Sequence, residues 1–364
     1  VNSSNSFCNW RGVICGSNGR VNELRLPGLG LTGSLSGTKF ALSSFVSTLK
    51  YAMATVQFKQ SNPKLMIFEE IGKLGELRKL SLRQNRFNGS IPAALSSCVH
   101  LRAIYLQHNH FSGQLPVHLF DLLELQYLDL HDNSLFGNIP WQISQLSSLR
   151  SIDLSSNRFS GDLPSSISSC QNLSSVNFSF NQFQGSIPPE WASLSNLSTL
   201  DLDSNALYGS VPSAIANCSK LSVLILQRNS FTGSILASLG SLARLTILSL
   251  AETGSVVPSH LLFNSTSLLL LNLSNNDLTG FLSPFFGLSG LQQLDFGNND
   301  LSGAIPPSLG NLSNLVYLSL SKNTLSGPIP YSLGNNLRQL QFINLSGNAL
   351  TGDIAYNWVF YNNI

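Results

Sequence analysis

The sequence predicts an α/β solenoid, a right-handed superhelix of short parallel strands, on three observations. Leucine accounts for 66 of the 364 residues, whereas only 20 residues are basic and 18 acidic; so much leucine with so little charge argues against disorder and requires extensive burial. A pattern of 24 residues, L-x-x-L-x-L-x-x-N-x-(L/F)-x-G-x-(I/L)-P, recurs along the chain, as over residues 77–92. Its asparagine returns at near-constant spacing from Asn85 to Asn348, with Thr253 in one of its places. A fixed period of this length predicts stacked repeats and not separate globular domains.

Each part of the repeat has a physical role. The L-x-L alternation directs Leu80 and Leu82 inward and Lys79 and Arg83 outward, which predicts a short strand that pairs in parallel with the next repeat. The asparagine amide offers two donors and an acceptor to the backbone groups of the turn that follows. Thr253 cannot make the same set of bonds, so we expect an irregular repeat there. Adjacent glycine and proline favour turns and 3₁₀ segments over a full α-helix on the far side of each repeat.

The repeat pattern divides the chain into a cap at residues 1–22, a solenoid of about thirteen repeats at residues 23–354, and an irregular end at residues 355–364 that suggests truncation. Residues 37–68 interrupt the first repeats, and their removal restores a normal continuation of the pattern. Two interpretations of this insertion stay open: a gene-model product such as a retained intron, or an island loop with a function. Val1 and the lack of a signal segment suggest a piece of a longer product.

The five cysteines fall into two groups. Cys8 and Cys15 precede the first repeat, where a disulfide with Trp10 packed beneath it could cap the apolar end of the stack in a secreted protein; two unpaired thiols are the alternative. The other three lie at a position where leucine is otherwise common, which predicts buried thiols. They are two or three repeats apart, too far for a shared metal ion. The three are Cys98, Cys170 and Cys218.

Composition and motifs restrict the function. The net charge of +2 gives no nucleic-acid footprint and no electrostatic attraction to a membrane, and no apolar run reaches the roughly 18 residues of a spanning helix. We expect no cofactor, no metal site and no catalysis. Asp129 and Asp153 lie one repeat apart, near the spacing of a retaining glycosidase, but any two acids in one column would do so, and an open sheet supplies no enclosing pocket. His108-x-His110 is interpreted as surface polarity.

The outward positions of the strands form columns that a ligand could contact. Aromatic, histidine and arginine side chains mixed with carboxylates are typical of interface anchors, although an ordinary solvated face is the alternative. The candidate ligand-binding residues are Arg83, Tyr105, Gln107, His108, Tyr127, Asp129, His131, Asp153, Arg158, Phe180, Asp201, Asp203 and Arg228.

N-x-S/T sequons suggest a glycosylated protein. They occur at Asn2, Asn88, Asn172, Asn177, Asn196, Asn217, Asn264, Asn272, Asn311 and Asn344. We expect Asn177, Asn272 and Asn344 to point outward from the strands, where a glycan would crowd a ligand.

The stretch C-x-W-x-G-V-x-C at residues 8–15, followed by 24-residue repeats with L-x-G-x-I-P, resembles the plant-specific class of extracellular leucine-rich repeats. The chain looks most like the ectodomain of a plant leucine-rich-repeat receptor-like kinase. This resemblance implies an apoplastic location, a peptide or protein ligand, a possible co-receptor kinase, and a single membrane span and serine/threonine kinase outside these residues. The alternative is a defence protein without a kinase, similar to polygalacturonase inhibitors, which would end after about ten repeats in a cysteine-bearing cap.

Overall fold

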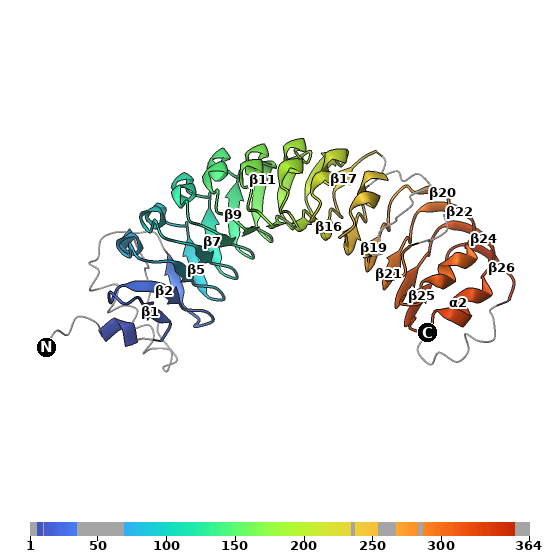
Figure 1. Cartoon of the computed structure of the whole chain (residues 1–364), viewed down its shortest axis with the longest axis horizontal. Helices are drawn as coiled ribbons and strands as arrows, with labels where there is room; N and C mark the ends of the chain where they lie inside the picture. The colour runs from blue at the N-terminus through green and yellow to red at the C-terminus, as the bar shows by residue number, and fades with distance from the viewer. Residues whose placement is uncertain are drawn as a thin grey trace. The chain divides into compact units, whose positions relative to one another are not determined.

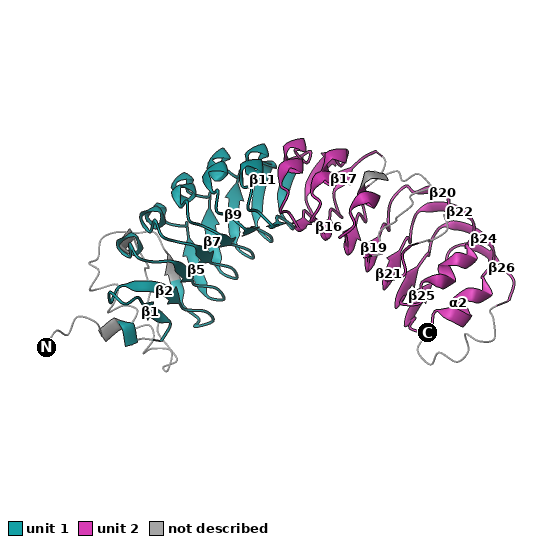
Figure 2. Ribbon diagram, in the orientation of Figure 1, with its two compact units in different colours: residues 1–183 teal, residues 184–364 magenta. Residues whose placement is uncertain are grey.

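The computed structural model describes residues 6–9, 11–34, 69–233, 237–253, 267–282 and 287–353. They belong to two compact units, residues 1–183 and residues 184–364 (Figure 2). The expected insertion at residues 37–68, the expected irregular end at residues 355–364 and Trp10 lie outside the described residues.

The L-x-L segments form the main strands of both units, which confirms the predicted parallel stacking. In register, Ile152 lies opposite Leu128 and Asp153 opposite Asp129. Unit 1 contains β2 (Val21–Arg25), β4 (Lys79–Ser81), β6 (Ala103–Tyr105), β8 (Tyr127–Asp129), β10 (Ser151–Asp153) and β12 (Ser175–Asn177), and β1 (Val13–Cys15), which precedes the repeats, lies beside β2. Unit 2 contains β14 (Thr199–Asp201), β16 (Val223–Ile225), β18 (Ile247–Ser249), β19 (Leu270–Asn272), β21 (Gln293–Asp295), β23 (Tyr317–Ser319) and β25 (Phe342–Asn344).

A second set of parallel strands follows the asparagine position, a feature that the sequence pattern did not predict. Within unit 1 it comprises β3 (Thr32–Ser34), β5 (Arg86–Gly89), β7 (His110–Gly113), β9 (Ser134–Gly137) and β11 (Arg158–Asp162), and β13 (Gln182–Gly185) spans the sequence boundary between the units. Unit 2 has β15 (Ala206–Gly209) beside β17 (Ser230–Phe231), and separately β20 (Thr279–Phe281), β22 (Asp300–Ala304), β24 (Thr324–Pro328) and β26 (Ala349–Thr351).

Short 3₁₀ turns complete the repeats and lie across each unit from its main strands (Figure 1). Most follow a proline whose backbone is extended, such as Pro92 at φ −72° and ψ 134°. The turns are η1 (Ser6–Asn9), η2 (Glu69–Lys73), η3 (Ala93–Ser97), η4 (Val117–Asp121), η5 (Trp141–Gln145), η6 (Ser165–Ser169), η7 (Pro189–Ser193), η8 (Ser213–Asn217), η9 (Ala237–Ser241) and η10 (Pro307–Asn311). One α-helix, α2 (Tyr331–Asn336), departs from this pattern within the described ranges.

The core of each unit is a stack of identical positions. Leu80 and Leu82 are fully buried, and burial of one such side chain contributes about 2 kcal/mol relative to exposure. Phenylalanines stack between repeats, with ring centroids 6.1 Å apart for Phe87 and Phe111. Cys98, Cys170 and Cys218 are buried in leucine places, and their thiols lie within 3.1–3.5 Å of carbonyl oxygens one repeat earlier.

The repeat asparagine holds the turn together as predicted. In Asn109, Nδ2 donates to the carbonyl oxygens of Leu82 and Leu106, both at 3.0 Å, while Oδ1 accepts the backbone N–H of Phe87 at 3.0 Å. In the irregular repeat, the Thr253 hydroxyl donates to the Leu250 carbonyl oxygen at 3.0 Å. Thr253 cannot donate to two carbonyl oxygens at once as the repeat asparagine does, because a hydroxyl has one proton and the amide has two.

The residue before each asparagine adopts a left-handed backbone that the sequence did not reveal. His108 has φ 56°, Phe180 φ 53° and Arg228 φ 53°, a region that non-glycine residues occupy at a cost. Hydrogen bonds to the next repeat offset this cost, as the N–H of His108 donates to the carbonyl oxygen of His131 at 3.0 Å.

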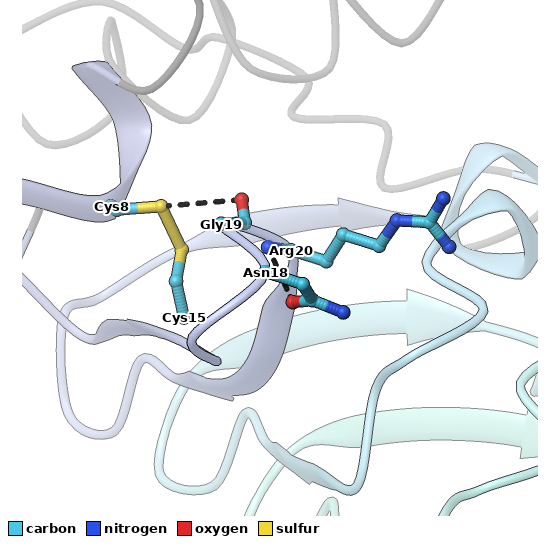
Figure 3. The surroundings of a disulfide bond; sticks show 5 residues. All are labelled: Cys8, Cys15, Asn18, Gly19 and Arg20. Carbon is cyan, nitrogen blue, oxygen red and sulfur yellow. Dashed lines mark hydrogen bonds between the residues drawn. A yellow bond between two sulfur atoms is a disulfide. The ribbon is translucent and has the colours of Figure 1, made fainter.

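A disulfide joins Cys8 to Cys15 at the start of unit 1 (Figure 3). The Cys8 sulfur lies 3.6 Å from the carbonyl oxygen of Gly19. Strand β1 pairs antiparallel with β2 and covers the edge that β2 would otherwise expose, and the disulfide ties η1 to the end of β1. Among the described residues, no helix has the length and apolarity needed to cross a membrane.

Candidate ligand-binding face

The outward side chains of β4, β6, β8, β10 and β12 form a surface that we call the strand face of unit 1. Strand pairing places Tyr105 opposite Asp129, and Asp129 opposite Asp153, in one column. Tyr127 belongs to the neighbouring column, opposite Ala103, and is 40% exposed. The period of 24 residues therefore converts sequence spacing into direct contact.

Two histidines meet on this face across neighbouring repeats. The Nε2 atoms of His108 and His131 are 3.1 Å apart, and their rings are nearly perpendicular. Each ring also contacts a carboxylate through its Nδ1 atom: His108 contacts Asp132 at 2.7 Å, and His131 contacts Asp129 at 2.7 Å. His108 and His131 are 44% and 26% exposed, so the pair is open to solvent.

The carboxylates fix the protons of this pair. A carboxylate only accepts hydrogen bonds, so each Nδ1 carries a proton and donates it. The two Nε2 atoms then face each other as lone pairs unless one of them is protonated. The hydrogen bond to Asp129 raises the pKa of His131 above its ordinary value, with burial acting in the opposite direction, and this favours His131 as the protonated ring.

Aromatic and basic side chains lie beside the histidines. The Nζ atom of Lys79 is 5.1 Å from the centroid of the Tyr105 ring, within the range of a cation–π contact. Burial is the main reason that the pKa of Tyr105 is raised, so its hydroxyl remains protonated at neutral pH. Tyr105 and Tyr127 present flat amphipathic surfaces, which are suited to anchoring a peptide or protein.

The two aspartates of the column have structural roles. Oδ1 of Asp153 accepts the N–H and the hydroxyl of Ser155 at 2.9 and 2.6 Å, and Oδ1 of Asp129 accepts the N–H of His131 at 3.3 Å. Aspartate and asparagine side chains commonly close turns in this way. Turn formation is therefore sufficient to explain why aspartate occupies this position in both strands.

Polar residues of unit 2 form a closed network around Asp203, which is buried with 5% of its surface exposed. The Arg228 guanidinium donates to both of its carboxylate oxygens, with Nε 2.9 Å from Oδ1. Gln227 donates to Oδ2 at 2.9 Å, and Ser204 donates to Oδ1 at 2.8 Å. The carboxylate is thus fully engaged inside the protein.

The prediction that Gln107 and Asp203 lie on the open face is therefore wrong. Gln107 is only 6% exposed, and Asp203 lies beneath Arg228. Asp203 is held between repeats by Gln227 and Arg228 of the next repeat, whereas Arg83, at the equivalent repeat position, is exposed. Of the other candidates, Arg83, Arg158, Phe180 and Arg228 are exposed, and Asp201 is half-buried.

The sequons differ in accessibility. Asn177, Asn272 and Asn344 are half-buried, and Oδ1 of each accepts a serine N–H two residues later. Asn196 is also half-buried, whereas Asn88, Asn172, Asn217 and Asn311 are exposed; Asn2 and Asn264 lie outside the described residues.

Sequence reasoning missed the contact between His108 and His131. It paired His108 with His110 along the chain, but the left-handed backbone at His108 directs this ring toward the next repeat. Asp132, the carboxylate partner of His108, was also missing from the candidate residues. A histidine 23 residues after another, one short of the period, was the available signal.

Models of the leucine-rich-repeat family match residues 76–98, 100–122, 124–146, 147–207, 267–288, 290–312 and 314–336. An Arabidopsis thaliana protein, MDIS1-interacting receptor like kinase 1, is 35% identical over 91 residues, which are 25% of this chain and 8% of that protein. The crystal structure of PEPR1–AtPEP1 is 28% identical with a TM-score of 0.76 and covers 98% of this chain and 50% of that one. The crystal structure of a TDR receptor is 30% identical with a TM-score of 0.72 and covers 80% and 55%. The chain thus spans about half of these structures and less than a tenth of the curated relative.

Proposed function

The chain belongs to the leucine-rich-repeat family, with homology to Arabidopsis receptor kinases, and from this premise we propose that it is the extracellular ligand-recognition region of a plant receptor kinase. It would bind a peptide or protein along the strand face of unit 1, on the apoplastic side of the plasma membrane. A membrane span, a kinase and a co-receptor would lie outside these residues. Catalysis forms no part of the proposal.

The observation that carries this proposal is the pair Tyr105 and Tyr127 on adjacent strands, beside the exposed His108 and the half-buried His131. At the strand position of Tyr105, β18 and β19 of unit 2 carry Ser249 and Asn272. At the strand position of Tyr127, β23 and β25 of unit 2 carry Tyr317 and Phe342, whose rings stack on each other with centroids 4.6 Å apart. Large aromatic anchors supply most of the binding energy of typical interfaces, so affinity would concentrate at β6 and β8. The similar crystal structure of PEPR1–AtPEP1 makes AtPEP1 the first ligand to test.

The test is a binding screen of the secreted chain against synthetic secreted-plant peptides, with AtPEP1 included as a reference probe. A peptide that binds is then titrated against a Tyr105→Ala/Tyr127→Ala double variant. We expect affinity to fall by more than tenfold, as for loss of anchor residues worth above 1.4 kcal/mol.

The matched control is Tyr208→Ala, which removes a 57% exposed tyrosine from β15, outside the main strands. It should leave the affinity unchanged. Equal affinity of the wild type and the double variant, or no binding by any peptide in the screen, would refute the proposal. Circular dichroism establishes that each variant is folded.

A further inference from the structure

The histidine pair has the arrangement of a metal-binding site. His108 and His131 each donate Nδ1–H to a carboxylate at 2.7 Å, and their Nε2 atoms lie 3.1 Å apart. In metal sites a histidine commonly donates its other ring N–H to a carboxylate, which fixes the tautomer and makes the metal-binding nitrogen more basic. Here two such histidines point the same nitrogen at one place.

We propose that the Nε2 atoms of His108 and His131 bind one divalent transition-metal ion of the Zn²⁺ or Cu²⁺ class. An ion about 2.0–2.1 Å from each nitrogen would see the two donors at an angle of roughly 100°, which suits four-coordinate geometry. It would lie between the two Nε2 lone pairs. Water or a ligand would fill its remaining positions, since both rings are open to solvent.

Neighbouring polar groups support a cation at this place. Oε1 of Gln107 is buried and has no hydrogen-bond partner among the described residues. Gln107 directly precedes His108 and corresponds to His131 in the register that pairs Tyr105 with Asp129. Asp153 adds negative charge, with Oδ2 3.9 Å from Nδ1 of His131.

A second arrangement uses the same histidine differently. Single ligand atoms of Asp129, His131 and Asp153 all lie within 4.8 Å of one another. To bind through Nδ1, His131 would have to give up its hydrogen bond to Asp129. The Nε2 pair keeps both carboxylate contacts, so we assign the site to His108 and His131.

The experiment is isothermal titration of the full 364-residue chain with ZnCl₂, and with MgCl₂ as a hard-cation comparison. We expect saturable binding of one Zn²⁺ and none of Mg²⁺ at the same concentration. His108→Gln and His131→Gln should each weaken Zn²⁺ binding at least tenfold. Asp132→Asn keeps both rings and should weaken it by roughly tenfold through loss of the supporting carboxylate.

The chain contains matched controls. His100 contacts Glu124 at 3.0 Å and His118 contacts Asp121 at 3.1 Å through Nδ1, but each pairs with a carboxylate alone. His100→Gln and His118→Gln should therefore leave the affinity within twofold of wild type. Unchanged affinity in folded His108→Gln would overturn the assignment, as would a larger loss of affinity in Asp153→Asn than in His108→Gln. Because no peptide is present, this outcome is independent of the proposed receptor function.

Discussion

Unit 1 and unit 2 each contain a diagonal contact between neighbouring repeats, and the two contacts leave their side chains in opposite states. In unit 2, Arg228 reaches back to Asp203, and a guanidinium covers a buried carboxylate. In unit 1, His108 reaches forward to His131, and two imidazoles meet in the open. Both Arg228 and His108 occupy the left-handed position before the repeat asparagine.

The contrast shows that one backbone position can direct a side chain into a buried ion pair or toward solvent. The pair in unit 2 satisfies its own charge and hydrogen-bonding capacity, so it has little to offer a ligand. The pair in unit 1 leaves two Nε2 atoms facing each other at 3.1 Å, which is the site proposed above for a cation. The identity of the diagonal partners, and not the repeat backbone, decides between the two outcomes.

Replacement of the unit 2 cation should have the largest effect. Arg228→Met leaves the buried Asp203 carboxylate without its guanidinium, and we expect a loss of about 3 kcal/mol in unfolding free energy, at the lower end for a broken buried pair because Gln227 still donates. Urea denaturation followed by circular dichroism measures it. The control is Arg102→Met, whose exposed contact with Glu124 should contribute less than about 1 kcal/mol. Equal losses in the two variants would contradict the distinction.

The regular and irregular turns can be compared directly by giving a unit 1 repeat the residue of the irregular repeat in unit 2. Asn109→Thr removes the amide that bridges Phe87, Leu82 and Leu106, and should lower the unfolding free energy by roughly 2 kcal/mol because buried backbone groups lose partners. Asn172→Thr, at an exposed site, should change it by less than about 0.5 kcal/mol. If Asn109→Thr lowered the unfolding free energy no more than Asn172→Thr, the Asn109 amide would not have the structural role assigned to it.

We expect the buried thiols to behave alike in both units. The difference between the units would then concern only the side-chain contacts between repeats and not the core. Burial raises the pKa of Cys98 to about 12 and that of Cys218 to about 11. The folded state retains the proton that the unfolded thiol loses near pH 9, so this stability is present below that pH and is lost as pH rises toward 11–12. In that window the unfolding free energy should fall by about 1.4 kcal/mol per pH unit for each thiol.

Urea midpoints at pH 8.5 and 10.5 test this expectation. The fall in stability between them should be smaller in Cys98→Ala and in Cys218→Ala than in the wild type, by a similar amount for each. A fall as steep in both variants as in the wild type would show that the thiols ionise equally in both states.

Removal of the unit 1 imidazole should have the smallest effect on stability. With a chelator present, His108→Gln should change the unfolding free energy by less than about 1 kcal/mol, because the side chain and its partner Asp132 are both exposed. Denaturation beside Arg228→Met measures the difference. A loss as large as that of Arg228→Met would mean that the histidine pair is a structural element.

The sequence by itself determined which residues stack. Its period placed Asp153 on Asp129 and Leu82 in the core, and it identified the asparagine that closes each turn, because parallel strands bring residues one period apart into register. Only the tertiary structure decided the diagonal contacts, the burial of Gln107 and Asp203, and the second set of strands. These depend on backbone angles and side-chain rotamers at the turn, which join different positions of neighbouring repeats. A repeat length fixes contacts between equivalent positions and leaves such angles undetermined.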